Sequence, residues 1–322
     1  MPQLTVLNNS RRAPHGGGIS GPGGPISDAA LQHLAADLAS VVAENGEVRF
    51  GDHDRLLYST DASLYQVQPL GVVVPGSVSD AANVVRFCAQ RAIPMLPRGG
   101  GTSLAGQCTN RAVIIDLTPR CRAIRSINVE QRTCEVEPGI TIDDLNDALA
   151  KRNTGLFFAP DPATTRQCAI GGAIGNNAAG ARSILYGRTS ENVHSIEVAL
   201  VTGERLWLGP NAGAADSTAR RLGAGVLEIV RDHATLIRER FPKTVRRNAG
   251  YGLDMILDQL DRGATPETVD LSKLLCGSEG TLAVTLAATL KLHPMPKSKG
   301  LVLLAFDSVD AALEAVGPIL TT

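Results

Sequence analysis

The sequence has no excess of either charge, and it has no long apolar run. Its formal net charge is −1, which argues against a nucleic-acid-binding surface, because phosphate binding needs clustered Lys and Arg side chains. No apolar stretch is long enough to span a bilayer, and the first residues lack the pattern of a signal peptide. These absences predict a cytoplasmic globular protein that does not bind nucleic acid.

Closely spaced metal ligands are also missing. Structural zinc and iron–sulfur sites use cysteines at C-x-x-C spacing, and the histidines show no ligand spacing either. We therefore expect no metal site, and we expect thiols that stay reduced and buried. The six cysteines are Cys88, Cys108, Cys121, Cys134, Cys168 and Cys276.

Two common nucleotide-binding fingerprints are absent as well, namely the Rossmann G-x-G-x-x-G pattern and the Walker pattern. The chain has instead a glycine-rich segment at residues 97–107, Pro-Arg-Gly-Gly-Gly-Thr-Ser-Leu-Ala-Gly-Gln. Glycine lets the main chain approach a ligand closely, and successive main-chain amides in such a turn bind anions. By itself the segment is also compatible with an ordinary tight turn.

A second segment of the same kind follows about seventy residues later. It contains Ala-Pro-Asp-Pro-Ala-Thr at 159–164, Ile-Gly-Gly-Ala-Ile-Gly-Asn-Asn-Ala-Ala-Gly at 170–180 and Ser-Ile-Leu-Tyr-Gly-Arg-Thr at 183–189. Two separated glycine-rich segments predict a diphosphate cradle made from two loops that meet.

In their order, these motifs resemble the FAD-binding domain of the vanillyl-alcohol oxidase and p-cresol methylhydroxylase type of flavoprotein. Within it, the chain is most similar to D-lactate, glycolate and D-2-hydroxyglutarate dehydrogenases. The resemblance covers residues 50–295, and its other motifs are Val-Val-Pro-Gly-Ser at 73–77, Glu-Pro-Gly at 137–139 and Gly-Ser-Glu-Gly-Thr-Leu at 277–282.

The resemblance implies an α+β fold in which two α/β lobes hold an extended FAD, the PCMH-type domain. We expect a disordered tail at 1–27, the FAD-binding domain at 28–298, and the beginning of a substrate-binding cap domain at 299–322. Relatives continue through the cap, so we expect this chain to be an N-terminal part of a longer or split enzyme.

The resemblance also implies the cofactor contacts. The first loop is expected to bind the diphosphate, and the later segments the rest of the cofactor. The expected FAD-binding residues are Pro75, Arg98, Gly99, Gly100, Gly101, Thr102, Ser103, Gly106, Gln107, Pro138, Gly139, Pro160, Asp161, Thr164, Gly171, Gly172, Asn176, Asn177, Gly180, Ser183, Tyr186, Gly187, Glu279, Gly280 and Val284.

For some of these residues a structural role is the alternative. Asp161 is also typical of a helix cap or an Asx turn. Tyr186 is also typical of a core position, and Glu279 is also typical of a surface charge. Thr102 stands where relatives that attach FAD covalently carry a histidine, so we expect non-covalent FAD.

The substrate side is expected at Arg246 and Arg247. A guanidinium group binds a carboxylate through two parallel hydrogen bonds, and related dehydrogenases place a basic residue near this point. The alternative is a solvated pair of charges after a helix end. Relatives often carry a hydroxyl residue near Ala249, so the pocket here is expected to differ.

The implied function is dehydrogenation of a D-2-hydroxy acid, with flavin as the redox group. The catalytic base of relatives lies in the cap, so none is assigned here, and we expect the chain alone to turn over substrate weakly or not at all. The electron acceptor stays open among a quinone, a cytochrome and an iron–sulfur partner, and so does peripheral contact with the inner face of the membrane. Alternatives are an FAD-binding subunit with a separate cap or iron–sulfur chain, an oxygen-using oxidase, and a non-catalytic nucleotide-binding protein.

Hydrophobic spacing and turn residues predict the local structure. The expected elements are a helix at 29–44 capped by Asp28, a strand at 71–75, a helix capped by Ser77 or Ser79, strands at 112–116, 122–129 and 133–137, a helix at 142–150 capped by Thr141, a hairpin of 196–201 with 205–208, one helix at 223–240, strands at 282–292 and 301–306, and a helix at 309–319 capped by Ser308.

Overall fold

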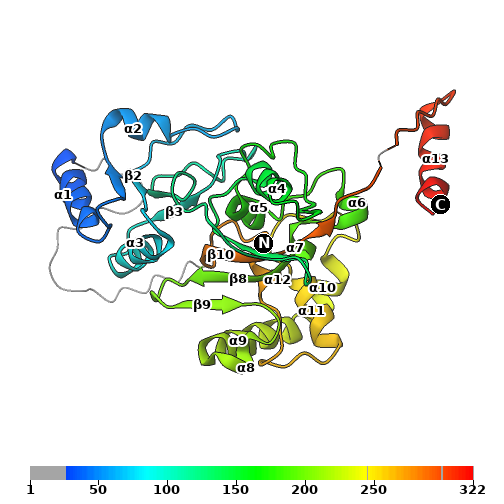
Figure 1. Ribbon diagram of the computed structural model, residues 1–322. Helices are drawn as coiled ribbons and strands as arrows, with labels where there is room; N and C mark the ends of the chain where they lie inside the picture. Colours follow the sequence, from blue (N-terminus) through cyan, green and yellow to red (C-terminus); the bar gives the residue numbers. More distant parts are fainter. Residues whose placement is uncertain (1–26, 245, 299, 322) are drawn as a thin grey trace, which may run out of the picture.

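The computed structural model describes residues 27–244, 246–298 and 300–321. The prediction of a disordered tail falls almost entirely on residues 1–26, which lie outside the described residues. The body of the molecule consists of two lobes, each with its own sheet (Figure 1). The chain therefore has the mixed helix and sheet fold that the sequence predicted.

The first lobe contains a four-stranded sheet in the order β1-β2-β4-β3. Strands β2, β4 and β3 run parallel, and β1 pairs with β2 in the antiparallel sense. The βαβ unit predicted from the sequence is confirmed, because α3 connects β2 to β3, and both strands pair in parallel with β4 between them. The bounds are β1 Glu47–Arg49, β2 Gly71–Val74, β3 Met95–Arg98, β4 Val113–Asp116, α1 Asp28–Ala39, α2 Asp52–Leu57 and α3 Val78–Gln90.

Two helix starts in this lobe test the predicted caps. The hydroxyl of Ser77 accepts a hydrogen bond from the amide of Asp80, which confirms Ser77 as the cap of α3. Ser27, rather than Asp28, caps α1, because the serine has the extended backbone that a cap position needs. Helix α1 ends at Ala39, five residues earlier than predicted.

The second lobe contains a five-stranded antiparallel sheet in the order β5-β6-β10-β8-β9. The predicted hairpin is present, with Ala199 opposite Arg205. The long central strand β10 pairs with β6 on one side and with β8 on the other. The bounds are β5 Ile124–Asn128, β6 Thr133–Val136, β8 Val193–Ala199, β9 Arg205–Leu208 and β10 Val284–Lys291.

Helices surround this second sheet, and a short pair of strands, β7 and β11, lies beside them. Thr141 caps α4 as predicted, since its hydroxyl accepts from the amide of Asp144. The bounds are α4 Ile142–Lys151, β7 Leu156–Phe157, α5 Ile170–Asn176, α6 Ser183–Tyr186, α7 Thr189–Asn192, α8 Ala212–Ala215, α9 Ser217–Asp232, α10 Ala234–Arg240, α11 Leu253–Asp261, α12 Ser272–Leu275 and β11 His293–Pro294.

The single helix predicted over 223–240 is wrong. The structure has two helices, α9 and α10, which meet at His233 with φ −107° and ψ 14°. The buried residues Leu227, Val230 and Ile237 keep helical spacing across the break. The apolar residues therefore keep helical spacing across the break between the two helices, so their periodicity did not reveal the break.

The two lobes share part of a hydrophobic core. Ala199 of β8, with Val284 and Leu286 of β10, packs in the cluster formed mainly by the first lobe. At the surface of the same junction, Arg205 donates to the hydroxyl of Ser79 at 2.9 Å and to Glu197 at 2.6 Å. These contacts fix the two lobes against each other.

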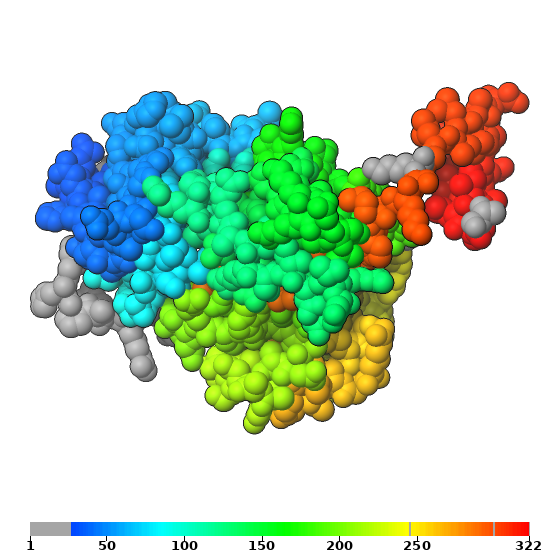
Figure 2. Space-filling model, in the orientation of Figure 1, coloured from blue at the N-terminus to red at the C-terminus, as the bar shows by residue number. Residues whose placement is uncertain are grey.

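The segment after residue 298 differs from the rest. The strand predicted at 301–306 is wrong: Leu301 and Leu303 are 87% and 88% exposed, and no described strand pairs with them. A strand needs a partner for its main-chain hydrogen bonds. Helix α13, Val309–Leu320, is capped by Ser308 as predicted and buries no residue, and it stands apart from the two lobes (Figures 1 and 2). The predicted boundary of a cap domain at 299 stays a prediction.

Candidate functional site

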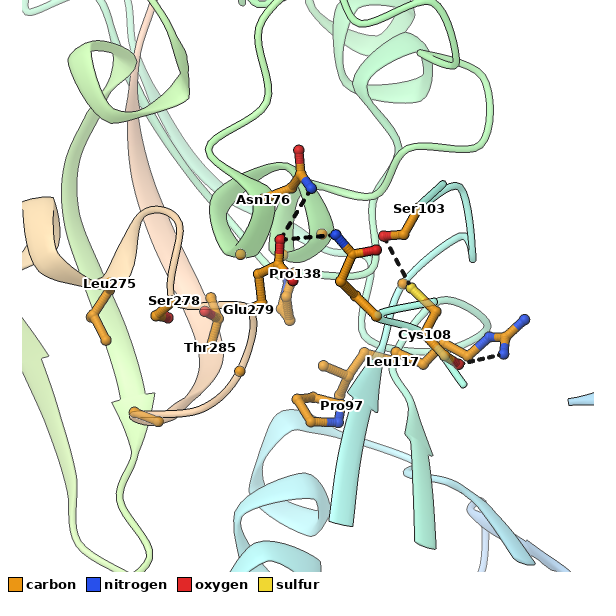
Figure 3. A pocket seen from close by; sticks show the side chains of 18 residues that line it. Pro97, Ser103, Cys108, Leu117, Pro138, Asn176, Leu275, Ser278, Glu279 and Thr285 are labelled. Atoms are coloured by element: carbon orange, nitrogen blue, oxygen red, sulfur yellow. Dashed lines mark hydrogen bonds between the residues drawn. The ribbon is translucent and has the colours of Figure 1, made fainter. Parts of the chain in front are cut away.

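A cleft lies between the two lobes and is lined by eighteen residues from both of them. The first lobe contributes residues at the ends of β3 and β4, and the second lobe contributes α5 and the turn before β10 (Figure 3). Ten of the expected cofactor residues line it: Arg98, Gly99, Ser103, Gln107, Pro138, Gly171, Gly172, Asn176, Glu279 and Gly280. The two glycine-rich segments thus meet at one place.

The first glycine loop, residues 99–107, presents main-chain amides. The amides of Gly100, Gly101, Thr102 and Ser103 donate no hydrogen bond to any other described residue. Free amides in successive positions favour an anion. Gly101 has φ +65°, a value that an L side chain rarely adopts, so the loop needs glycine there.

The guanidinium group of Arg98 lies against Gly101 of this loop, and its donors bond to main-chain carbonyl oxygens. Its guanidinium group donates to the carbonyl oxygens of Cys108 and Thr60, both at 2.8 Å, and of Tyr58 at 3.2 Å. The side chain therefore holds the loop against residues 58–60. Its contribution of positive charge to diphosphate binding stays a prediction.

The other expected residues of the first loop support its shape. A Cβ atom on Gly100 would overlap the carbonyl oxygen of Gln167, so Gly100 allows the two loops to touch. Gly106 has φ +83° and packs against the ring of Tyr65. Pro75 is buried beyond the end of β2, and it is not among the residues that line the cleft.

The second lobe brings α5 to the cleft. The amide of Gly171 donates to the carbonyl of Pro138 at 2.8 Å, which ties the start of α5 to the loop after β6. A Cβ atom on Gly172 would meet nothing within 4 Å, so the main chain there is open to a ligand. Gly139, next to Pro138, packs against the carbonyl of Leu117 and does not line the cleft.

The rest of the second loop uses its polar groups internally. Asn177, at φ +50°, is buried and accepts from the amide of Ser190 at 2.9 Å. The carboxylate of Asp161 accepts from the amide of Arg182 at 3.0 Å, and the hydroxyl of Ser183 donates to the carbonyl of Gly180 at 2.7 Å. These residues do not line the cleft, and they shape the loop. The bond of Asp161 reaches 21 positions along the chain, so it is not the Asx turn that was the alternative.

The remaining predicted residues of this loop also lie off the cleft lining. Tyr186 packs edge-on against Phe157 and His293, at centroid distances of 5.4 and 4.8 Å. Gly187 ends α6 at φ +80°. Pro160 is buried, and the carbonyl of Thr164 accepts from the amide of Cys168 at 2.7 Å.

A third segment, 277–280, completes the cleft. Gly277 and Gly280 have φ +95° and +77°, and Glu279 has φ +51°. The Glu279 carboxylate accepts from Gln107 at 3.2 Å and from Asn176 at 3.3 Å (Figure 3). Val284 instead points into the core shared by the lobes, while its neighbours Ala283 and Thr285 line the cleft.

Sequence reasoning missed eight lining residues. Three of them, Pro97, Gly175 and Ser278, belong to motifs that it singled out, and Cys108 directly follows the first motif. Ala283 and Thr285 follow from the two-residue alternation of a strand once Val284 points inward. Leu117 and Leu275 carry no signal in the sequence. The eight are Pro97, Cys108, Leu117, Gly175, Leu275, Ser278, Ala283 and Thr285.

Arg246 and Arg247 have different surroundings. The Arg247 side chain is 9% exposed, forms an ion pair with Asp254 and lies over the ring of Phe241. Arg246 is exposed, and its hydrogen bond goes to the carbonyl of Gly180 at 3.2 Å. Neither lines the cleft, but Arg246 is the one whose charge has no described acidic partner.

The cysteines divide into two groups. Burial raises the pKa of Cys88, Cys121, Cys134 and Cys276 to about 12 and that of Cys168 to about 11. Cys108 is half-buried, lines the cleft and lies 3.4 Å from the hydroxyl of Ser103. It is therefore the thiol that reagents can reach most easily.

In the described part of the chain, no group of three or more His, Cys, Asp or Glu side chains could hold a metal ion. Over the same residues, no helix has the length and apolar character needed to cross a membrane.

Comparisons with known proteins agree with this geometry. Residues 69–209 match the family described as an FAD binding domain. The chain is similar to D-2-hydroxyglutarate dehydrogenase of Pantoea ananatis, 37% identical over 295 residues, which cover 88% of this chain and 28% of that protein. It is also similar to glycolate oxidase subunit GlcD of Bacillus subtilis, 29% identical over 284 residues, covering 87% of this chain and 49% of that subunit.

Among solved structures, alkyldihydroxyacetonephosphate synthase matches with a TM-score of 0.59 at 18% identity, covering 83% of this chain and 44% of that one. At that identity the match concerns the fold alone. The chain thus spans from about a quarter to half the length of the relatives named here.

The two lobes enclose a cleft lined by glycines of both loops, and the amides of Gly99 and Ser103 there donate to no described residue. Residues 69–209 of this chain carry the FAD-binding domain of the FAD-linked oxidase family. The residues fit such a cofactor, because Gly99 and Ser103 offer unpaired amides at the cleft and Gly172 leaves room for close approach.

Proposed function

We propose that this chain is the FAD-binding part of a D-2-hydroxy-acid dehydrogenase. The observation that carries the proposal is the cleft between the lobes, which Gly99 and Ser103 of the first loop line together with Gly171, Gly172 and Asn176 of α5. Similarity to D-2-hydroxyglutarate dehydrogenases over most of the chain supports the substrate class.

The cleft assigns separate tasks to the chain's own residues. The amides of Gly99 and Ser103 and the open main chain at Gly172 hold the diphosphate. Arg98 keeps the first loop in place through its three carbonyl contacts. When bound, FAD supplies the two-electron redox chemistry, and the protein orients the reactants.

The attachment is non-covalent, because Thr102 cannot form a histidyl–flavin bond. Acid denaturation should release all of the flavin into the supernatant. Flavin that stays with the polypeptide after denaturation would contradict this assignment, and labelling by mass spectrometry would then show whether Cys108, the thiol in the cleft, carries it.

The substrate carboxylate is bound by Arg246. Arg247, the other predicted residue, is engaged with Asp254 and Phe241, whereas Arg246 is exposed and contacts one carbonyl. No catalytic base is assigned among the described residues. The electron acceptor, a cytoplasmic location and peripheral contact with the inner face of the membrane stay predictions.

The experiment that tests the proposal has two parts. The purified chain is titrated with FAD, and quenching of flavin fluorescence should reach one equivalent per chain. D-2-hydroxyglutarate, D-lactate and glycolate are then added separately to the loaded protein, and at least one should bleach or shift the visible flavin band. A chain that takes up no FAD, or a loaded chain indifferent to all three acids, would contradict the corresponding part.

A second function is favoured by the similarity to glycolate oxidase subunits. In that case the chain works as an FAD-binding subunit together with a separate polypeptide. An oxygen-using oxidase is distinguished by hydrogen peroxide formed on reoxidation of the reduced protein.

A further inference from the structure

Three segments that are distant in the sequence meet at the carboxylate of Glu279. Gln107 ends the first glycine loop, Asn176 ends α5, and Glu279 lies in the turn before β10. Both amide groups donate to the same oxygen, Oε1, at 3.2 and 3.3 Å (Figure 3). The first of these bonds joins the two lobes across the cleft.

The backbone of Glu279 has an unusual conformation. Its φ of +51° is disfavoured for a residue with a Cβ atom, and such outliers persist where the surrounding structure holds them. The amide of Glu279 donates to the carbonyl of Gly175 at 2.9 Å. The turn is thus fixed to α5 by its main chain, and its side chain is directed toward Gln107.

The charge of Glu279 argues against direct contact with a diphosphate, because two anions in one cleft repel each other. The carboxylate instead receives two side-chain amides that the sequence had assigned to the cofactor. Its other oxygen, Oε2, accepts no hydrogen bond from a described residue.

We propose that Glu279 is a positioning residue that joins Gln107 and Asn176 across the cleft and thereby sets the spacing between the first glycine loop and α5. The proposal rests on the proposed function, since that spacing determines how well the two sets of amides fit one diphosphate. Glu279 acts on the cofactor through the two loops and does not bind it directly.

A double-mutant cycle for FAD binding tests the proposal, with Glu279→Ala, Gln107→Ala and the double variant. Each single change should raise the Kd for FAD, by about tenfold for Glu279→Ala, and the double variant should bind no worse than Glu279→Ala. If the increases in Kd of the two single variants multiply in the double variant, Glu279 contacts the cofactor itself and the proposal is overturned.

We call the two hydrogen bonds of Glu279 with Gln107 and Asn176 the clamp. The variant Glu279→Gly distinguishes loss of the clamp from an effect on folding. Glycine accepts φ +51° without strain, so the melting temperature without FAD should stay the same or rise, while the Kd for FAD rises as in Glu279→Ala. The matched control is Glu267→Ala, because Glu267 is exposed, pairs with Arg220 at 3.6 Å and lies off the cleft. A Kd for Glu279→Gly within twofold of the control would contradict the clamp.

A measurement without FAD distinguishes failure of the clamp from failure of the proposed function. Amide hydrogen exchange should become faster in Glu279→Ala at residues 103–107 and 175–177 together, and should be unchanged in Glu267→Ala. Unchanged exchange in both segments would overturn the clamp, even if the protein binds FAD.

Discussion

The first glycine loop, residues 99–107, leaves its main-chain amides free, whereas the second loop, residues 159–189, uses its polar groups to hold itself together. In the first, outside segments provide the bracing, since Arg98 reaches back to carbonyls at 58–60 and at 108. In the second, Asn177, Ser183 and Asp161 bond to neighbours within the loop or the helix that follows. Similar composition therefore serves a binding surface in one place and a scaffold in the other.

The difference between the loops also appears in their glycines. Gly100 is packed, since a Cβ atom would overlap the carbonyl of Gln167, while Gly172 faces open space. The contact at Gly100 is where the two loops touch, and the space at Gly172 is where a ligand approaches.

Gly100→Ala should have the largest effect. The added methyl group forces the loops apart, which should lower the free energy of unfolding by about 3 kcal/mol. Gly172→Ala is the matched control, with unchanged stability but weaker FAD binding. Chemical denaturation and FAD titration measure the two effects. Equal stability losses for both variants would contradict the assignment of Gly100 to loop contact and Gly172 to the ligand.

Arg98→Ala should come next. It removes the donor for three carbonyl oxygens, and the expected loss of stability is about 2 kcal/mol, with weaker FAD binding as a consequence. Lysine in the same position cannot serve three carbonyls with the same geometry, so Arg98→Lys should recover little. If Arg98→Ala kept full stability but lost FAD affinity, the side chain would be a phosphate ligand instead of a brace.

Asn177→Ala tests the scaffold role of the second loop. The side chain is buried and accepts from the amide of Ser190, so its removal should cost about 1–2 kcal/mol of stability. The Kd for FAD of the folded protein should change less than in Gly172→Ala. A larger change in affinity than in stability would place Asn177 at the cofactor.

Thiol labelling compares the accessibility of Cys108, beside the first loop, with that of Cys168 in the second loop, and it needs no mutation. At pH 8, the buried cysteines, with pKa values raised to about 11–12, hold almost no thiolate. Cys108 should therefore react first with iodoacetamide, and bound FAD should protect it. Peptide mass spectrometry identifies the site, and rapid labelling of Cys168 instead would contradict the geometry.

The smallest effect is expected at His293, which packs against Tyr186 of the second loop. Burial, followed by the charges of Lys291 and Arg132, lowers the pKa of His293 below 6.5. The unfolded chain then binds a proton at a higher pH than the folded one, so stability should fall as the pH drops below 6.5 and level off below the folded pKa. His293→Gln should reduce this fall, which we expect to be under about 1 kcal/mol, in denaturation curves between pH 5 and 7.5.

The local elements were largely predictable from the sequence. Ser77, Thr141 and Ser308 cap helices where their spacing from apolar residues indicated. One exception is His233, where the helix breaks although the apolar residues keep helical spacing. Residues 301–306 show the other limit, since an apolar run becomes a strand only when another strand is available to pair with it.

The candidate site was predictable as a set of segments but not as a set of contacts. Ten of the eighteen lining residues were expected, because glycine-rich motifs indicate where the main chain is exposed. The direction of a side chain depends on neighbours that come from elsewhere in the sequence. Val284 turns into the shared core for this reason, while Thr285 faces the cleft.

The sequence by itself predicted a diphosphate cradle made from two glycine-rich segments, since glycine allows the chain to turn tightly. The resemblance to a known family added FAD and the third segment, Gly277–Leu282. Only the tertiary structure decided which atoms face the cleft. Arg98 bonds to three carbonyl oxygens, and Glu279 turns inward to two amides. The physical reason is that each polar group takes the partners which the packed lobes bring within hydrogen-bond distance, and those partners lie up to 172 positions away in the chain.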